Sequence, residues 1–120
     1  MKIVYVDDDP NICSEVEDFF FFVDCQAWVF NKPRECWDFL VETDGEIDVL
    51  IVDLVMPEMD GTDLILKCIE AFGNKIKFGV VSGRIDISGK FSEVANVVDL
   101  VVEKPLRSTD LHILLEAVPT

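Results

Sequence analysis

Acidic residues follow two strand-like segments of the chain, at the point where each segment ends. Val49 to Val52 is a short apolar run rich in β-branched residues, a pattern typical of a buried parallel strand, and Asp53 comes directly after it. Lys2 to Val6 is a similar run and is followed by Asp7 to Asp9. Ligands of open α/β sheets bind outside the carboxyl ends of the strands. Carboxylates at these positions are therefore candidate nucleophiles or metal ligands.

Five strand-like segments alternate with helical segments along the chain. The strands are expected at 2–6, 27–30, 49–53, 77–81 and 100–102. Four helices are expected to begin at or near Pro10, Pro33, Thr62 and Thr109, with Thr62 as an N-cap. The remaining helix precedes the last strand and should be short. Its apolar residues Phe91, Val94, Ala95 and Val98 recur at helical spacing.

This alternation predicts a single α/β domain over residues 1–120, doubly wound as (βα)5 with a flavodoxin-like five-stranded parallel sheet. Right-handed crossovers place the helices on both faces of such a sheet. The strand order 2-1-3-4-5 puts the first and third strands side by side. Asp7, Asp8 and Asp53 are then expected to converge at one crevice.

Three converging carboxylates raise one another's pKa unless a cation lies among them. Mg²⁺ is the expected cation, because it binds one or two carboxylates, keeps several waters and completes its shell with phosphate oxygens. A carboxylate can also attack phosphorus and form an aspartyl phosphate, while the metal neutralises the charge that develops on the phosphoryl group. Ser82 and Lys104 end the next two strands, where a hydroxyl and an ammonium could reach phosphoryl oxygens.

The segments VDDDP, IVDLVMPEMDG, VVSGR and VEKP occur together in this order. With these segments the chain resembles the receiver domain of two-component response regulators over its whole length. The resemblance implies that Asp53 is phosphorylated by a phosphohistidine on a sensor histidine kinase or a histidine phosphotransferase. It implies that Ser82 and Lys104 grip the phosphoryl group. The implied output is phosphorylation-dependent interaction with a downstream protein, without turnover as an enzyme.

The resemblance also implies the metal ligands and the residues that flank them. Asp8 and Asp53 would bind Mg²⁺ directly, together with the backbone carbonyl of Val55, and Asp7 would act largely through water. Val55 and Arg84 flank the phosphoryl site and favour a slowly decaying phosphoryl state. Val101 departs from the family, which usually has an aromatic residue there that moves with the hydroxyl when the domain switches.

Two other functions fit parts of the pattern. A receiver-like scaffold would bind a partner through a static surface, without phosphorylation. A small magnesium phosphatase of the haloacid dehalogenase type would use Asp7 as nucleophile and Asp9 as acid. That family requires a further acidic pair after the lysine, and here only Asp110 and Glu116 follow. The length of 120 residues also leaves little room for its larger catalytic core.

The composition limits which classes of binding partner and which cellular compartment are expected. The net charge of −14, from 24 acidic and 10 basic residues, repels phosphate backbones and anionic lipids, so neither nucleic acid nor a membrane is expected as a partner. No signal peptide or transmembrane run is visible, and a cytoplasmic protein is expected. A dimer through the fourth and fifth helices is compatible with the resemblance. The four cysteines contain no C-x-x-C pair, which favours reduced, buried thiols over a zinc site or disulfides.

Four consecutive phenylalanines, Phe19 to Phe22, end the first predicted helix. Phe19 and Phe20 continue its apolar face, whereas Phe21 and Phe22 fall off that face. One helix stripe cannot bury all four rings. The end of the helix is therefore either wedged beneath a loop or carries an exposed aromatic patch that binds a partner.

Overall fold

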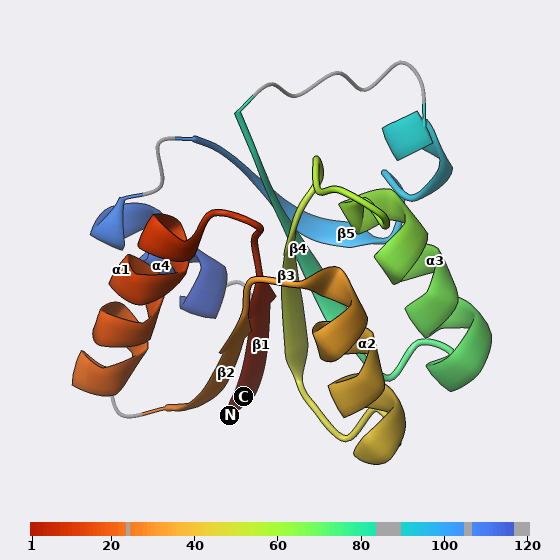
Figure 1. Cartoon of the computed structure of the whole chain (residues 1–120), viewed down its shortest axis with the longest axis horizontal. Helices are drawn as coiled ribbons and strands as arrows, with labels where there is room; N and C mark the ends of the chain where they lie inside the picture. The colour runs from red at the N-terminus through yellow and green to blue at the C-terminus, as the bar shows by residue number, and fades with distance from the viewer. Residues whose placement is uncertain (24, 84–89, 105–106, 117–120) are drawn as a thin grey trace.

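The protein forms a parallel sheet with helices on both faces (Figure 1). This computed structural model describes residues 1–23, 25–83, 90–104 and 107–116. The five strands lie in the order β2-β1-β3-β4-β5, as predicted. They are β1 (Lys2–Val6), β2 (Gln26–Phe30), β3 (Val49–Asp53), β4 (Lys77–Ser82) and β5 (Val98–Glu103).

Among the described residues, four α-helices and one 3₁₀ helix lie between the strands or after the last of them. They are α1 (Pro10–Phe22), α2 (Pro33–Glu42), α3 (Gly61–Phe72), η1 (Lys90–Glu93) and α4 (Ser108–Glu116). Figure 1 shows α1 and α4 on one face of the sheet and α2 and α3 on the other. Within the described residues, no helix is both long enough and apolar enough to span a bilayer.

The central strands β1 and β3 contribute to the apolar core on both faces of the sheet. Val4 of β1 packs with the α2 and α3 side, and Ile3 packs with the α1 and α4 side. All five residues of β3 are buried, as its uninterrupted apolar run predicts. Val6 is paired with Val52 across the two strands. The carboxylates that follow these two residues are therefore held side by side.

The third helix begins earlier than predicted. Its N-cap is Asp60, whose carboxylate accepts a hydrogen bond from the Asp63 N–H at 2.9 Å, whereas Thr62 is buried inside the first turn. The prediction of Thr62 as N-cap was therefore wrong. Gly61 explains the difference, because a Cβ there would lie 2.6 Å from the carbonyl oxygen of Asp53. The chain can pass this close to the end of β3 only at a glycine, and the helix starts at that point.

The segment before β5 is only partly helical among the described residues. Phe91 and Val94 are buried, as their spacing predicts, and a 3₁₀ helix covers Lys90–Glu93. Ala95 is exposed, and Val98 belongs to β5, so these two were wrongly assigned to a helix face. The strand starts early because Val98 already pairs with Phe78, next to a register shift in the β4–β5 ladder.

None of the four cysteines forms a disulfide, as expected, and three of them are buried while Cys25 is half-buried. Cys36 and Cys68 are fully buried between the sheet and its helices, and burial raises the pKa of the Cys68 thiol to about 12. Phe21 and Phe22 are 85% and 83% exposed. Of the two alternatives for the end of the first helix, the exposed aromatic patch is the one observed.

Candidate functional site

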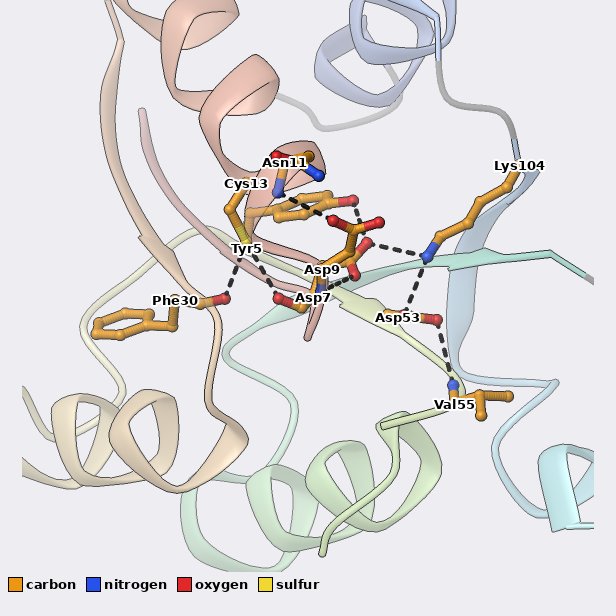
Figure 2. Close-up of polar contacts among 9 residues, drawn as sticks. All are labelled: Tyr5, Asp7, Asp9, Asn11, Cys13, Phe30, Asp53, Val55 and Lys104. Carbon is orange, nitrogen blue, oxygen red and sulfur yellow. Dashed lines mark hydrogen bonds and ion pairs between the residues drawn. The ribbon is translucent and has the colours of Figure 1, made fainter. Parts of the chain in front are cut away.

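Asp7 lies directly after β1 and is completely buried. Its Oδ2 accepts a hydrogen bond from the Tyr5 hydroxyl at 3.2 Å, and its Oδ1 accepts one from the Asp9 N–H at 3.0 Å. The Lys104 ammonium lies 3.1 Å from Oδ2 (Figure 2). A buried carboxylate requires such partners, since burying an unpaired charge is costly.

Asp53 is the last residue of β3 and is only 3% exposed. Its Oδ1 accepts a hydrogen bond from the Val55 N–H at 3.2 Å, so the loop after β3 folds back onto the carboxylate. Its Oδ2 accepts one from the Lys104 ammonium at 3.1 Å. Lys104 therefore bridges two buried carboxylates, and Figure 2 shows its long side chain reaching between them from the end of β5.

Burial and charge set the pKa values in this cluster. The pKa of Asp53 is raised to about 6, mainly by burial and also by the charge of Asp7, while the hydrogen bond from Lys104 partly offsets both. For Lys104, burial opposes the charged form, but the hydrogen bonds to Asp53 and Asp7 outweigh it and raise the pKa. At neutral pH Asp53 is therefore mainly ionised and Lys104 carries its proton.

A third carboxylate completes an acidic group that fits a metal ion. Asp7, Asp8 and Asp53 each offer one oxygen, and these oxygens lie within 4.8 Å of one another. Asp8 is exposed, so the group opens to solvent on that side. Carboxylate oxygens are hard donors, and here three carboxylates lie beside the single ammonium of Lys104. Such a site suits a small divalent cation such as Mg²⁺. The predicted convergence of these three residues is confirmed.

Two further predicted residues, Ser82 and Val55, lie beside this group. Ser82 ends β4 and is 1% exposed, and its carbonyl accepts a hydrogen bond from the Lys104 N–H at 2.7 Å. Val55 directs its N–H toward Asp53 while its side chain is 74% exposed. Arg84 lies outside the described residues.

Two residues beneath the site were missed from the sequence. The Cys13 thiol donates to the Asp7 carbonyl at 3.1 Å and lies 3.5 Å from the Phe30 carbonyl, and burial raises its pKa to about 11. The Tyr5 hydroxyl donates to the Asp7 carboxylate. The sequence did contain one signal for Tyr5, since it lies two residues before Asp7. Residues two apart on a strand point to the same face of the sheet.

Tyr5→Phe is expected to lower the free energy of unfolding by about 1.5 kcal/mol, because it removes a donor to a buried, charged acceptor and keeps the ring. Urea unfolding at pH 7 measures this loss. The same substitution in an Asp7→Asn background should cost clearly less. Equal losses in both backgrounds would assign the effect to packing of the ring and contradict a role for the hydrogen bond.

Comparison with known proteins agrees with this geometry. Residues 3–116 match the response regulator receiver domain family. The chain is 30% identical over 119 residues to the transcriptional regulatory protein FlgR of Helicobacter pylori, a match that covers 98% of this chain and 29% of FlgR. The chain thus spans less than a third of that relative.

Two solved structures show the same fold. The chemotaxis protein CheY4 of Vibrio cholerae superposes with a TM-score of 0.84 at 20% identity, over 98% of each chain. The response regulator protein TrrA of Thermotoga maritima, solved in complex with Mg²⁺ and BeF, has a TM-score of 0.80 at 17% identity over 96% of each chain. Because the family match covers nearly the whole chain and the order of its strands agrees, this protein belongs to the response regulator receiver domains of two-component signalling.

Proposed function

We propose that the protein is a phosphoacceptor whose Asp53 takes a phosphoryl group from a phosphohistidine. The observation that carries this proposal is the pairing of Asp53 and Asp7 with one ammonium, 3.1 Å from each, beside a third carboxylate. Such a cluster holds a nucleophile, a cation and a metal site within one crevice. The pKa of about 6 leaves Asp53 mainly ionised at neutral pH, as a nucleophile requires.

Receiver domains bind Mg²⁺ at an acidic aspartate cluster. In this chain Asp8, Asp53 and the Val55 carbonyl would hold the ion directly, and Asp7 would hold it largely through water. Bound there, Mg²⁺ supplies a positive charge that stabilises the transferring phosphoryl group. That TrrA was solved with Mg²⁺ and BeF supports this assignment.

The transfer itself uses the residues at the strand ends. A carboxylate oxygen of Asp53 forms a bond to phosphorus as the bond between phosphorus and the donor imidazole nitrogen breaks. The electron pair of the broken bond stays on the imidazole. The Lys104 ammonium, which lies against Asp53 before the reaction, and the Ser82 hydroxyl would donate hydrogen bonds to the phosphoryl oxygens.

Receiver domains interact in general with histidine kinases and with downstream effectors. We assign the donor to a sensor histidine kinase or a histidine phosphotransferase, and the output to a downstream protein whose affinity changes on phosphorylation. The four cysteines form no disulfide, which favours the reducing cytoplasm as the compartment. In this scheme the protein assists its own phosphorylation and dephosphorylation, without turning over a separate substrate.

Intact mass after incubation with Mg²⁺ and acetyl phosphate tests the proposal. Wild type is expected to gain one phosphoryl group, and Asp53→Asn is expected to gain none. Asp38→Asn, which changes an exposed aspartate on α2, serves as the matched control and should gain phosphate as wild type does. Chelation of Mg²⁺ should prevent the gain. Phosphate on Asp53→Asn, or none on wild type, would contradict the assignment.

Val101 favours a second candidate function, a scaffold that works without phosphorylation. Its side chain lies on β5 and is 38% exposed, at the position where the family resemblance places a moving aromatic residue. A valine has no ring to swing between buried and exposed positions. If the protein takes up phosphate but binds its downstream partner equally in both states, the scaffold is the better description.

A further inference from the structure

The end of α1 carries an exposed aromatic pair that the phosphorylation site does not use. Phe21 and Phe22 are 85% and 83% exposed, and their rings lie edge to face with centroids 6.0 Å apart. Exposed apolar patches on soluble proteins commonly mark interaction sites. We refer to these two residues as the Phe21–Phe22 ridge.

A surface cavity adjoins this ridge. Its volume is about 340 Å³, and Phe20, Phe21, Cys25, Ala27, Val29 and Glu17 line it. Five of these side chains are apolar, and the sixth supplies a carboxylate. The cavity lies between α1 and β2, which is the outer strand on this side of the sheet. Ridge and cavity together resemble half of an interface, with apolar surface next to a negative charge.

The surrounding charge selects among possible occupants. Residues 3–31 contain no lysine or arginine. Glu15, Glu17 and Asp18 lie on α1 itself, which therefore carries three acidic residues and no basic one. A second copy of the chain would bring the same negative surface against this one, and like charges across an interface are costly. A positively charged partner would be attracted to the same surface.

We propose that the ridge and its cavity dock a protein segment that combines an apolar anchor with lysine or arginine. The anchor would fill the cavity over Phe20, Ala27 and Val29. The basic side chain would pair with Glu17 or stack on an exposed phenylalanine ring. Well-packed aromatic and apolar anchors provide most of the binding energy of such interfaces.

This docking site is separate from the phosphoryl site. α1 runs antiparallel to the strands, and Figure 1 shows its C-terminal end at the opposite end of the sheet from the acidic cluster. The helix is about 20 Å long at 1.5 Å per residue. Binding at the ridge should therefore not require a phosphoryl group on Asp53. The inference goes beyond the proposed function and can fail or succeed independently of it.

Titration of the full, ¹⁵N-labelled chain with designed peptides tests the proposal. The probe is an amphipathic peptide with leucines on one face and lysines on the other. One control peptide replaces every lysine with glutamate, and another replaces every leucine with serine. The cationic apolar peptide is expected to shift the amide signals of residues 17–22 and 27–29, and the controls are expected not to bind.

Matched variants locate the site. The double substitution Phe21→Ser and Phe22→Ser should weaken binding of the cationic apolar peptide about tenfold or more. Glu17→Gln should weaken it about threefold, since a single exposed ion pair contributes little. Val41→Ser, at a 54% exposed apolar position on α2, and Asp53→Asn should leave the affinity unchanged. Except for Asp53, these positions are exposed, and asparagine has nearly the same shape as aspartate, so the variants should fold, which circular dichroism verifies.

Several outcomes would overturn the proposal. One is equal binding of the peptide that carries glutamate, and another is binding that survives loss of both phenylalanines. Absence of binding by the cationic apolar peptide would have the same meaning. Sedimentation of the protein alone supplies the last test, because self-association abolished by the double substitution would make a second copy the occupant.

Discussion

Lys104→Met is expected to lower the free energy of unfolding by about 3 kcal/mol at pH 7 without divalent cations. Lys104 lies 3.1 Å from each of two carboxylates, Asp7 and Asp53, which are 0% and 3% exposed. Methionine fills a similar volume but leaves both charges buried without their cation. The loss should shrink as the pH falls below about 6, because protonation of Asp53 then removes one of the two charges.

Urea unfolding of wild type and Lys104→Met in the presence of a chelator measures this effect. Lys32→Met is the matched control, since it removes the same charge from an exposed position and should change stability little. Millimolar Mg²⁺ should restore part of the loss if the acidic cluster accepts a cation in place of the ammonium. A loss as small as that of the control would show that the carboxylates do not depend on Lys104.

Asp53→Asn is expected to stabilise the protein by about 3 kcal/mol at pH 7 in chelator, because a raised pKa measures the cost of the ionised form. The pKa of Asp53 rises from the ordinary value of 3.8 to about 6 in the folded protein. The folded state thus favours the protonated side chain. The stability gained from this preference for protonated Asp53 is fully present below about pH 4. It is lost as the pH rises through about 6. Asparagine does not titrate and avoids this loss.

The difference between Asp53→Asn and wild type should therefore be small at pH 4 and largest above pH 6. Thermal or urea unfolding across this range gives the comparison. Asp38→Asn, at an exposed site on α2, should show no such pH-dependent gain. A wild-type protein as stable as Asp53→Asn at pH 7 would mean that Lys104 fully compensates for the burial of the carboxylate.

The acidic cluster could be predicted from the sequence because it depends on where strands end. Asp7 and Asp53 each follow a buried apolar run, and the order 2-1-3-4-5 places those runs side by side. Local pattern and topology determine these positions without any knowledge of side-chain packing. The strand order and the convergence of both residues with Asp8 are confirmed.

The partners of these carboxylates depend on packing that local pattern does not contain. Tyr5 has the pattern of an ordinary strand residue until Asp7 is seen on the same face. The contact of Cys13 with the Asp7 carbonyl depends on the angle at which α1 leaves β1. Asp60 and Thr62 are both suitable N-caps by residue type, and the close approach of Gly61 to β3 decides between them. The spacing of apolar residues along a helix likewise cannot show whether a loop covers a phenylalanine that lies off the apolar face, as Phe21 and Phe22 do.

Lys104 follows a strand at the edge of the sheet. In the part of the chain that the structure describes, β5 pairs on one side only, with β4, and Val102 is the one buried residue of its six. Local opening costs least where backbone pairing and apolar burial are sparse, so β5 should separate from the sheet more readily than β1 or β3. Each such opening withdraws the ammonium from both carboxylates. The electrostatic balance of the acidic cluster is therefore coupled to a conformational equilibrium at the periphery of the fold, and a ligand that alters one must shift the other.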